Sequence, residues 1–273
     1  MRCNNPALRH VAPKSDEGAR TCNGWQLAVK HGSLPLRVAS PTTKPDGRSL
    51  LSRMVRFGFV GQLALAILLF LPAGTLKFWQ GWAFIVVNLA ATLLFCIYFY
   101  KHDPQLLERR LLTKEKIGAQ KFIMLLLKLV SAIAYILCGF DFQFGWSRAW
   151  LAPVPWWLTL LALALYLVCY LLFIPVLNAN RFAASVIQVE AGQTVAGTGP
   201  YRIVRHPMYS VSLGIWFCLP LALGSFVVLP VAALMVPILI FRLLNEEKFL
   251  RRELPGYSEY CQRTRYRLIP LVW

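Results

Sequence analysis

The sequence lacks the cysteine and histidine patterns that mark disulfide-rich and metal-binding proteins. Its seven cysteines are scattered, odd in number and mostly inside apolar runs, with no Cys-x-x-Cys pair and no His/Cys cluster at ligand spacing. We therefore expect neither a disulfide framework nor a metal site.

Residues 1–50 also lack hydrophobic periodicity, and they contain no apolar centre of the kind that a secretory signal peptide needs. They are rich in Pro, Gly, Ser and charge and cannot bury enough surface to fold alone, so we expect a disordered, basic cytoplasmic tail. Residues 51–273 are then the membrane-embedded domain. Met54 opens an apolar run and is an alternative start of the chain.

Negative charge is scarce as well. The chain has 12 Asp and Glu against 29 Lys and Arg, a formal net charge of +17, and 57% of its 273 residues are hydrophobic. The cations lie between the apolar runs, which is typical of the cytoplasmic loops of membrane proteins and argues against a nucleic-acid partner. The composition therefore predicts a polytopic membrane protein rather than a soluble domain.

Six apolar stretches are each close to the ~20 residues that cross a bilayer. They are residues 57–74, 79–100, 122–142, 156–178, 207–223 and 225–244, to within a few positions. The last two are joined only around Gly224, so they predict a tight helical hairpin. The expected fold class is an all-α, polytopic membrane helix bundle of about six spans.

Lys and Arg gather in alternate connections, whereas the opposite ones hold only Lys77 and Arg148. By the positive-inside rule both termini are cytoplasmic, in an integral multi-pass protein that we expect in the bacterial inner membrane. One cytoplasmic stretch, "HDPQLLERRLL" (residues 102–112), predicts a short interfacial helix. We interpret it as a basic membrane-surface segment rather than a substrate-binding one.

Two polar stretches have a pattern suited to chemistry. In "GTGPYRIVRHPMYS" (residues 197–210), Pro207 suits a first helical turn, and Arg205 and His206 add donors there, so a carboxylate or phosphate would be held well. In "FRLLNEEKFLRRELPGYSEY" (residues 241–260), Glu247 falls on an otherwise apolar helical face and needs a ligand or an arginine. Glu246 lies on a more polar side, where Arg242 can pair with it.

These stretches, "GPYRIVRHPMY" and "NEEKFL…GYSEYCQRTRYRLIP", together with the upstream "SVIQVEAGQ", resemble the isoprenylcysteine carboxyl methyltransferase family and its bacterial relatives, which are similar to phospholipid N-methyltransferases. The resemblance extends over about residues 50–273 and is most specific over 185–267. It implies a membrane helix bundle that binds S-adenosylmethionine at its cytoplasmic end and takes a lipid-like or prenylated acceptor from the bilayer. Carboxyl O-methylation is the expected reaction.

The resemblance also implies site residues. Those that match the cofactor-binding stretch are Gln188, Gly199, Tyr201, His206, Pro207 and Tyr209. The family's paired glutamates correspond to Glu246 and Glu247, one of which would contact the cofactor. Arg205, Arg242 and Glu247 form the expected catalytic group, with Arg242 placing the acceptor carboxylate. A carboxylate acceptor is already ionised at neutral pH, so no general base is expected.

Two other readings stay open. NADPH-dependent membrane sterol or steroid reductases share an "RHPxY" element and a similar ending, although they usually carry Asn where this chain has Met208. A non-catalytic scaffold or transporter is the second, and the scarcity of charge within the spans argues against a transport path. The acceptor is equally open: an isoprenoid acid, a small thiol or amine, or a phospholipid headgroup would each be compatible.

Overall fold

The computed structural model describes residues 37–38, 47–111, 118–180, 182, 189–190 and 193–273. The chain divides into two compact units, Met1–Pro35 and Leu36–Trp273, and all described residues belong to the second. The tail predicted over residues 1–50 therefore lies outside the described residues, apart from residues 37–38 and 47–50.

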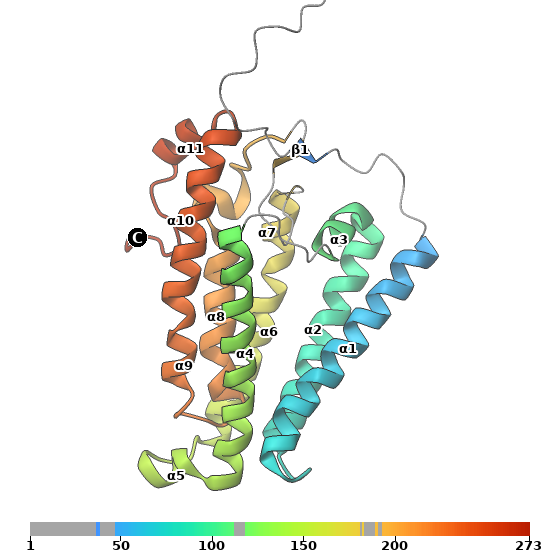
Figure 1. Ribbon diagram of the computed structural model, residues 1–273, viewed down its shortest axis with the longest axis vertical. Coiled ribbons are helices and arrows are strands. Elements are labelled where there is room, and N and C mark those ends of the chain that lie inside the picture. Colours follow the sequence, from blue (N-terminus) through green and yellow to red (C-terminus); the bar gives the residue numbers. More distant parts are fainter. Residues whose placement is uncertain (1–36, 39–46, 112–117, 181, 183–188, 191–192) are drawn as a thin grey trace, which may run out of the picture. The chain divides into compact units, whose positions relative to one another are not determined.

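The described chain is helical, as predicted. The helices are α1 (Gly47–Ala73), α2 (Trp79–His102), α3 (Pro104–Leu111), α4 (Gly118–Phe144), α5 (Trp146–Trp150), α6 (Trp156–Leu171), α7 (Phe173–Ala179), the 3-10 helix η1 (Gly199–Arg202), α8 (Pro207–Ala222), α9 (Leu229–Ala233), α10 (Met235–Glu253) and α11 (Tyr257–Arg263). Within the described ranges the strands are β1 (Arg37–Val38) and β2 (Val189–Glu190), which pair in parallel. Figure 1 shows the long helices running side by side, with α5 near one end and α11 near the other.

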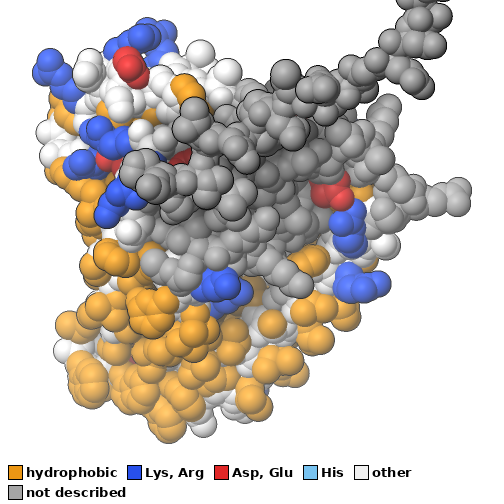
Figure 2. All heavy atoms as spheres, turned by 45° about the horizontal axis from the view of Figure 1, so that its top comes forward, with side chains coloured by type: hydrophobic (Ala, Val, Ile, Leu, Met, Phe, Trp, Pro, Cys, Tyr) orange, Lys and Arg blue, Asp and Glu red, His pale blue; other side chains and the backbone are white. Residues whose placement is uncertain are grey.

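Five helical stretches in the described part are long and apolar enough to cross a membrane: Leu50–Ala73, Trp79–His102, Gln120–Phe144, Trp156–Ala179 and Leu229–Glu253. The protein is thus an integral multi-pass membrane protein. Large apolar side chains such as Phe59 and Leu71 are exposed on these helices, as expected for surfaces that face lipid. Figure 2 shows hydrophobic side chains covering one end of the visible face, with Lys and Arg gathered toward the other.

The prediction of six similar spans needs one correction. The expected fifth span forms α8, which has 16 residues and is about 24 Å long, short of the ~30 Å hydrocarbon core. Pro207 starts this helix, and the turn after it is closed by Gly224, with φ of +73°, and by a bond from Ser225 N to Pro220 O at 2.8 Å. The tight hairpin is therefore confirmed, but its first arm is short.

Glycines set how closely two helix pairs pack. A Cβ on Gly139 of α4 would lie 2.5 Å from the Leu69 carbonyl oxygen of α1, and one on Gly214 of α8 would lie 2.8 Å from Cys169 Sγ of α6. The missing side chains let these backbones approach, which is how membrane helices gain packing energy without a hydrophobic driving force between them. The α6–α8 contact holds the short helix in the bundle.

The end of the bundle near α5 is closed by a buried carboxylate. Asp141 of α4 accepts hydrogen bonds from Ser147 N at 2.7 Å and Ser147 Oγ at 2.5 Å. The same hydroxyl oxygen accepts from Phe226 N and Val227 N at 2.9 and 3.2 Å. One serine thus ties the α4–α5 turn to the α8–α9 turn, and it satisfies backbone donors that would otherwise be unpaired.

Candidate functional site

The two polar stretches singled out in the sequence meet at the end of the bundle that carries α11. Arg205 N donates to Tyr266 O at 2.8 Å and His206 N donates to Arg267 O at 3.0 Å, so the segment before α8 is fixed against the C-terminal segment. His206 is the residue that precedes α8, and Pro207 begins it. The backbone pairing therefore places the side chains of Arg205 and His206 at the start of a helix, as the sequence predicted.

Glu247 of α10 is only 3% exposed and lies at the centre of this meeting point. Arg205 Nη1 donates to Glu247 Oε1 at 2.8 Å, and His206 Nε2 lies 3.3 Å from the same oxygen. On the other oxygen, Arg267 Nε donates at 3.3 Å, and Arg251 Nη2 lies 3.7 Å away. A carboxylate on an apolar helix face is thereby neutralised by three arginines, which together carry more positive charge than it cancels.

A second set of polar contacts runs beside the first. Tyr209 OH donates to Glu246 Oε2 at 2.5 Å, and the buried Arg242 donates from Nε to Tyr209 OH at 3.1 Å and from Nη1 to Gln120 Oε1 at 3.0 Å. Glu246 and Arg242, expected to pair directly along the helix, thus meet at the tyrosine hydroxyl. Gln120 of α4 was not anticipated, because it is more than 100 positions away in the chain.

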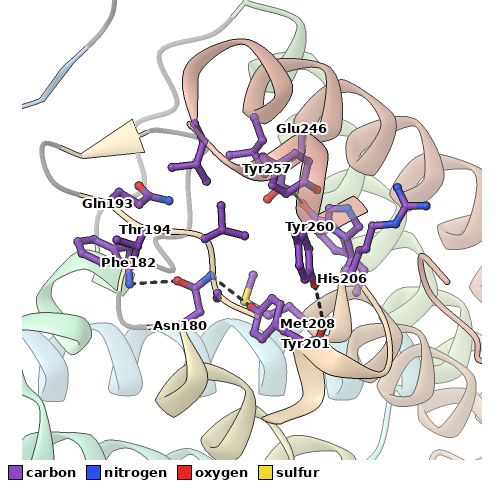
Figure 3. A pocket seen from close by; sticks show the side chains of 16 residues that line it. Asn180, Phe182, Gln193, Thr194, Tyr201, His206, Met208, Glu246, Tyr257 and Tyr260 are labelled. Atoms are coloured by element: carbon purple, nitrogen blue, oxygen red, sulfur yellow. Dashed lines mark hydrogen bonds between the residues drawn. The ribbon is translucent and has the colours of Figure 1, made fainter. Parts of the chain in front are cut away.

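A pocket that is partly open to solvent lies next to both sets of contacts. Five of the sequence-predicted residues line it: Tyr201, Arg205, His206, Tyr209 and Glu246. Figure 3 shows that the residues around it come from the segments near residues 180 and 194, from η1, the start of α8, α10 and α11. The pocket therefore draws on six chain segments that only the fold brings together.

The remaining predicted residues lie around this pocket or beyond the described chain. Glu247 and Arg242 lie behind the residues that line it, and Pro207 is buried at the start of α8. Gly199 has a φ of +55°, a backbone conformation that favours glycine, where η1 begins. Gln188 lies outside the described residues.

Two buried donors in the pocket wall have no protein partner among the described residues. They are Arg205 Nε and Tyr257 OH. Burial raises the pKa of Tyr257, and the carboxylates of Glu247 and Glu246 raise it further, so its hydroxyl stays protonated and able to donate. Unpaired buried donors are costly, and two of them in one pocket wall point to a ligand that accepts hydrogen bonds.

Sequence reasoning missed Tyr257, Tyr260 and Asn180 as pocket residues. Tyr260 OH donates to Tyr201 O at 2.8 Å, and Asn180 Nδ2 donates to Tyr201 OH at 3.4 Å (Figure 3). Burial raises the pKa of Tyr201 to about 12, so its hydroxyl is neutral. The spacing of the tyrosines in "GYSEY" was the available signal, because residues three apart on a helix share a face.

Comparison with known proteins adds a family relationship. The sequence pattern of the phospholipid methyltransferase family matches residues 154–255, which include α6–α10 and the residues around Arg205 and Glu247. The chain is also 28% identical over 162 residues to the cobalt-zinc-cadmium resistance protein CzcN of Cupriavidus metallidurans. That match covers 56% of this chain and 63% of the relative, less than two thirds of its length.

These matches confirm the resemblance drawn from the "RHP" and "NEE" stretches, and Tyr257 and Arg267 of the site lie beyond the matched range. The protein is an integral multi-pass membrane protein, and its residues 154–255 are similar in sequence to the phospholipid methyltransferase family.

Proposed function

We propose that the protein is an S-adenosylmethionine-dependent methyltransferase that acts on a lipid-like or isoprenoid acceptor at the cytoplasmic membrane face. Carboxyl O-methylation is the reaction that its charge distribution favours. The observation that carries the proposal is the pair of buried donors without a protein partner among the described residues, Arg205 Nε and Tyr257 OH, in residues that line a pocket at the start of α8.

The residues present fit the methyl donor. Arg205, His206, Tyr257 and the positive end of the α8 dipole would hold its carboxylate, because charge-assisted bonds at a helix start suit an anion. Glu246 would face its ammonium group or ribose hydroxyls. When bound, S-adenosylmethionine supplies a methyl group on a positively charged sulfur. Glu247 would act indirectly, because its carboxylate contacts Arg205 and His206 and holds their side chains in place.

Methyl transfer to a carboxylate would need little acid–base catalysis by these residues. An oxygen lone pair of the acceptor forms the new C–O bond as the C–S bond breaks, and that electron pair stays on sulfur. No proton moves, so no base is required. What the protein contributes is alignment of acceptor oxygen, methyl carbon and sulfur, and exclusion of water by the tyrosines that border the pocket.

The orientation is part of the proposal. The site end of the bundle carries α3 and α11, whose flanking segments hold much of the chain's Lys and Arg. The positive-inside rule then makes this end cytoplasmic, with both termini on the same side, in the bacterial inner membrane.

Cofactor binding by the full chain in lipid nanodiscs tests the proposal. We expect titration calorimetry to detect S-adenosylmethionine and not NADPH, and Arg205→Ala to weaken that binding by at least about tenfold through loss of a charge-assisted contact. Arg148→Ala, on the helix α5 at the other end, is the matched control and should bind normally. Tight NADPH binding without S-adenosylmethionine binding would reject the assignment in favour of a reductase.

The product is identified in the same preparation. Membranes containing the protein are incubated with S-adenosylmethionine labelled in its methyl group, and the label is followed into the lipid phase. A base-labile methyl ester is the expected product, because carboxyl O-methylation creates one. Label in a base-stable N-methyl headgroup would retain the methyltransferase and reject the carboxylate acceptor.

A further inference from the structure

Residues 267–273, which follow α11, form a tight loop with an apolar tip, and we call them the apolar loop. The oxygen of Trp273 accepts bonds from the backbone N–H groups of three successive residues, 267–269, at 2.9, 3.0 and 3.3 Å, and these bonds close the loop. The four residues at its tip are all apolar and exposed: Ile269, Pro270, Leu271 and Val272. Single exposed apolar side chains are ordinary on a protein surface, whereas an unbroken run at the tip of one loop indicates a binding surface.

The backbone of Leu271 supports this interpretation. Among the described residues, Leu271 is the one non-glycine residue with a positive φ, at +66°. A leucine in this region meets a steric cost that glycine, asparagine and aspartate largely avoid. Its side chain is 85% exposed, so contacts within the protein offset little of that cost. The conformation turns an apolar side chain outward, where a contact outside the protein would offset the cost.

The apolar loop lies at the depth of the membrane. Leu268 is buried in a cluster with Leu239 and Leu243 of α10, and Trp273 packs against the same cluster. Figure 1 shows the C-terminus next to α10. Measured from Leu229, where this membrane-spanning stretch begins, Leu239 and Leu243 lie about 15 and 21 Å along the helix, within the ~30 Å of a hydrocarbon core. The loop therefore packs against a part of α10 that is still inside the membrane thickness.

The surface around this depth suits lipid rather than a protein partner. Phe241 and Leu244 of α10 are exposed between and beside the residues that Leu268 contacts, so the bundle already presents an apolar face there. The exposed Arg263 and Arg265 precede the loop. An apolar tip next to positive charge is typical of the headgroup boundary, where apolar side chains enter the acyl region and arginines meet anionic phosphates.

The apolar loop is also bonded directly to the candidate site. Ser210 Oγ donates to the carbonyl oxygen of Leu268 at 2.6 Å. The guanidinium of Arg267, which donates to Glu247 Oε2 at 3.3 Å, lies over the ring of Trp273 at 4.9 Å from its centroid. Whatever holds the loop in place therefore also holds one of the arginines that neutralise the buried carboxylate.

We propose that the apolar loop is a membrane-docking element. Its tip enters the upper acyl region of the leaflet on the site's side of the bundle, and Arg263 and Arg265 contact anionic lipid headgroups. This docking is independent of the proposed reaction, because exposure, backbone conformation and depth alone point to it. The lipid surface then helps to fix the segment that supplies Arg267 to Glu247.

Photo-cross-linking of the full chain locates the loop. A benzophenone amino acid replaces Leu271 in protein held in nanodiscs of phosphatidylcholine and phosphatidylglycerol, and mass spectrometry identifies what it captures after irradiation. We expect lipid adducts at a yield close to that from Phe59, which is exposed on the membrane-spanning α1. Glu253 is the matched control: it is exposed and lies about 36 Å along the helix from Leu229, beyond the hydrocarbon core, so it should give few.

A substitution at the tip separates lipid from water by the sign of its effect. Asparagine adopts a positive φ more readily than leucine, so in water Leu271→Asn would raise the unfolding midpoint or leave it unchanged. In a docked loop the same change places an amide in the acyl region, and we expect the midpoint in nanodiscs to fall by about 2–4 °C. Leu271→Met keeps an apolar side chain and is the matched control, expected to change the midpoint little.

Three results would overturn the proposal: no lipid adducts from position 271 while Phe59 gives them, adducts from position 271 with a second copy of the chain in place of lipid, or a midpoint that rises or stays the same in Leu271→Asn. The second would assign the loop to an interface between copies instead. Failure of the proposed function is a separate outcome, because neither measurement uses S-adenosylmethionine.

Discussion

Two carboxylates, Asp141 and Glu247, are almost equally buried, with 4% and 3% exposure, yet they lie toward opposite ends of the bundle and have opposite surroundings. Asp141 accepts hydrogen bonds from the neutral N–H and O–H groups of Ser147, and these close a turn. Glu247 faces three arginines and a histidine. Burial alone therefore does not mark a functional carboxylate. A functional carboxylate is marked instead by more opposite charge around it than folding requires.

The largest expected effect comes from Glu247→Gln, which keeps the shape of the side chain and removes its charge. The arginines around it would lose their common counter-ion, and breaking a buried pair in this way costs about 3–5 kcal/mol. We expect a large fall in the thermal unfolding midpoint in nanodiscs and loss of measurable S-adenosylmethionine binding. Unchanged stability and binding would show that the arginines do not depend on this carboxylate.

The substitution Asp141→Asn tests the buried carboxylate at the other end of the helix bundle and allows a comparison with Glu247→Gln. The substitution weakens the bonds from Ser147, and we expect a loss of about 1–3 kcal/mol in stability, the range for an impaired buried hydrogen-bond network. Affinity for S-adenosylmethionine should stay within twofold in the folded protein, because neither Asp141 nor Ser147 lines the pocket. A matching loss of affinity would mean that the two ends are coupled, and the contrast drawn here would fail.

Tyr257→Phe separates ligand binding from stability within the site. Its hydroxyl has no protein partner in the described chain, so its removal should leave the unfolding midpoint unchanged and weaken S-adenosylmethionine binding by about 3- to 10-fold. Tyr260→Phe is the matched control: it loses the bond to Tyr201 O and should lower stability instead. If Tyr257→Phe destabilised the protein without changing affinity, its hydroxyl would have a structural role.

The smallest effect is expected for Arg251→Ala. Arg251 lies 3.7 Å from Glu247, but its side chain is 44% exposed, so solvent screens the pair. Such i, i+4 contacts contribute at most about 0.5 kcal/mol, and we expect both the unfolding midpoint and the S-adenosylmethionine affinity to change little. A loss comparable with that of Arg205→Ala would mean that the total charge around Glu247, rather than the buried contact, controls the site.

The features that the sequence predicted well are local ones. Apolar runs marked the long helices, because crossing a bilayer requires about 20 apolar residues whatever the fold. Pro207 marked the start of α8, and the apolar spacing around Glu247 marked an inward carboxylate, because both follow from helix geometry. The fifth apolar stretch was predicted at 207–223 and α8 is Pro207–Ala222, so its bounds were predicted well; the error was to count so short a helix as a full membrane span.

The sequence by itself determined the class of protein, the helices and the two stretches that carry polar chemistry, because charge, hydropathy and proline act over a few residues. Only the tertiary structure decided which donors are left unpaired, that Arg267 neutralises Glu247, and that Leu268 packs with residues of α8 and α10. These depend on contacts between segments far apart in the chain. The placement of a charge relative to another helix is set by packing, for which a single sequence has no short-range signal.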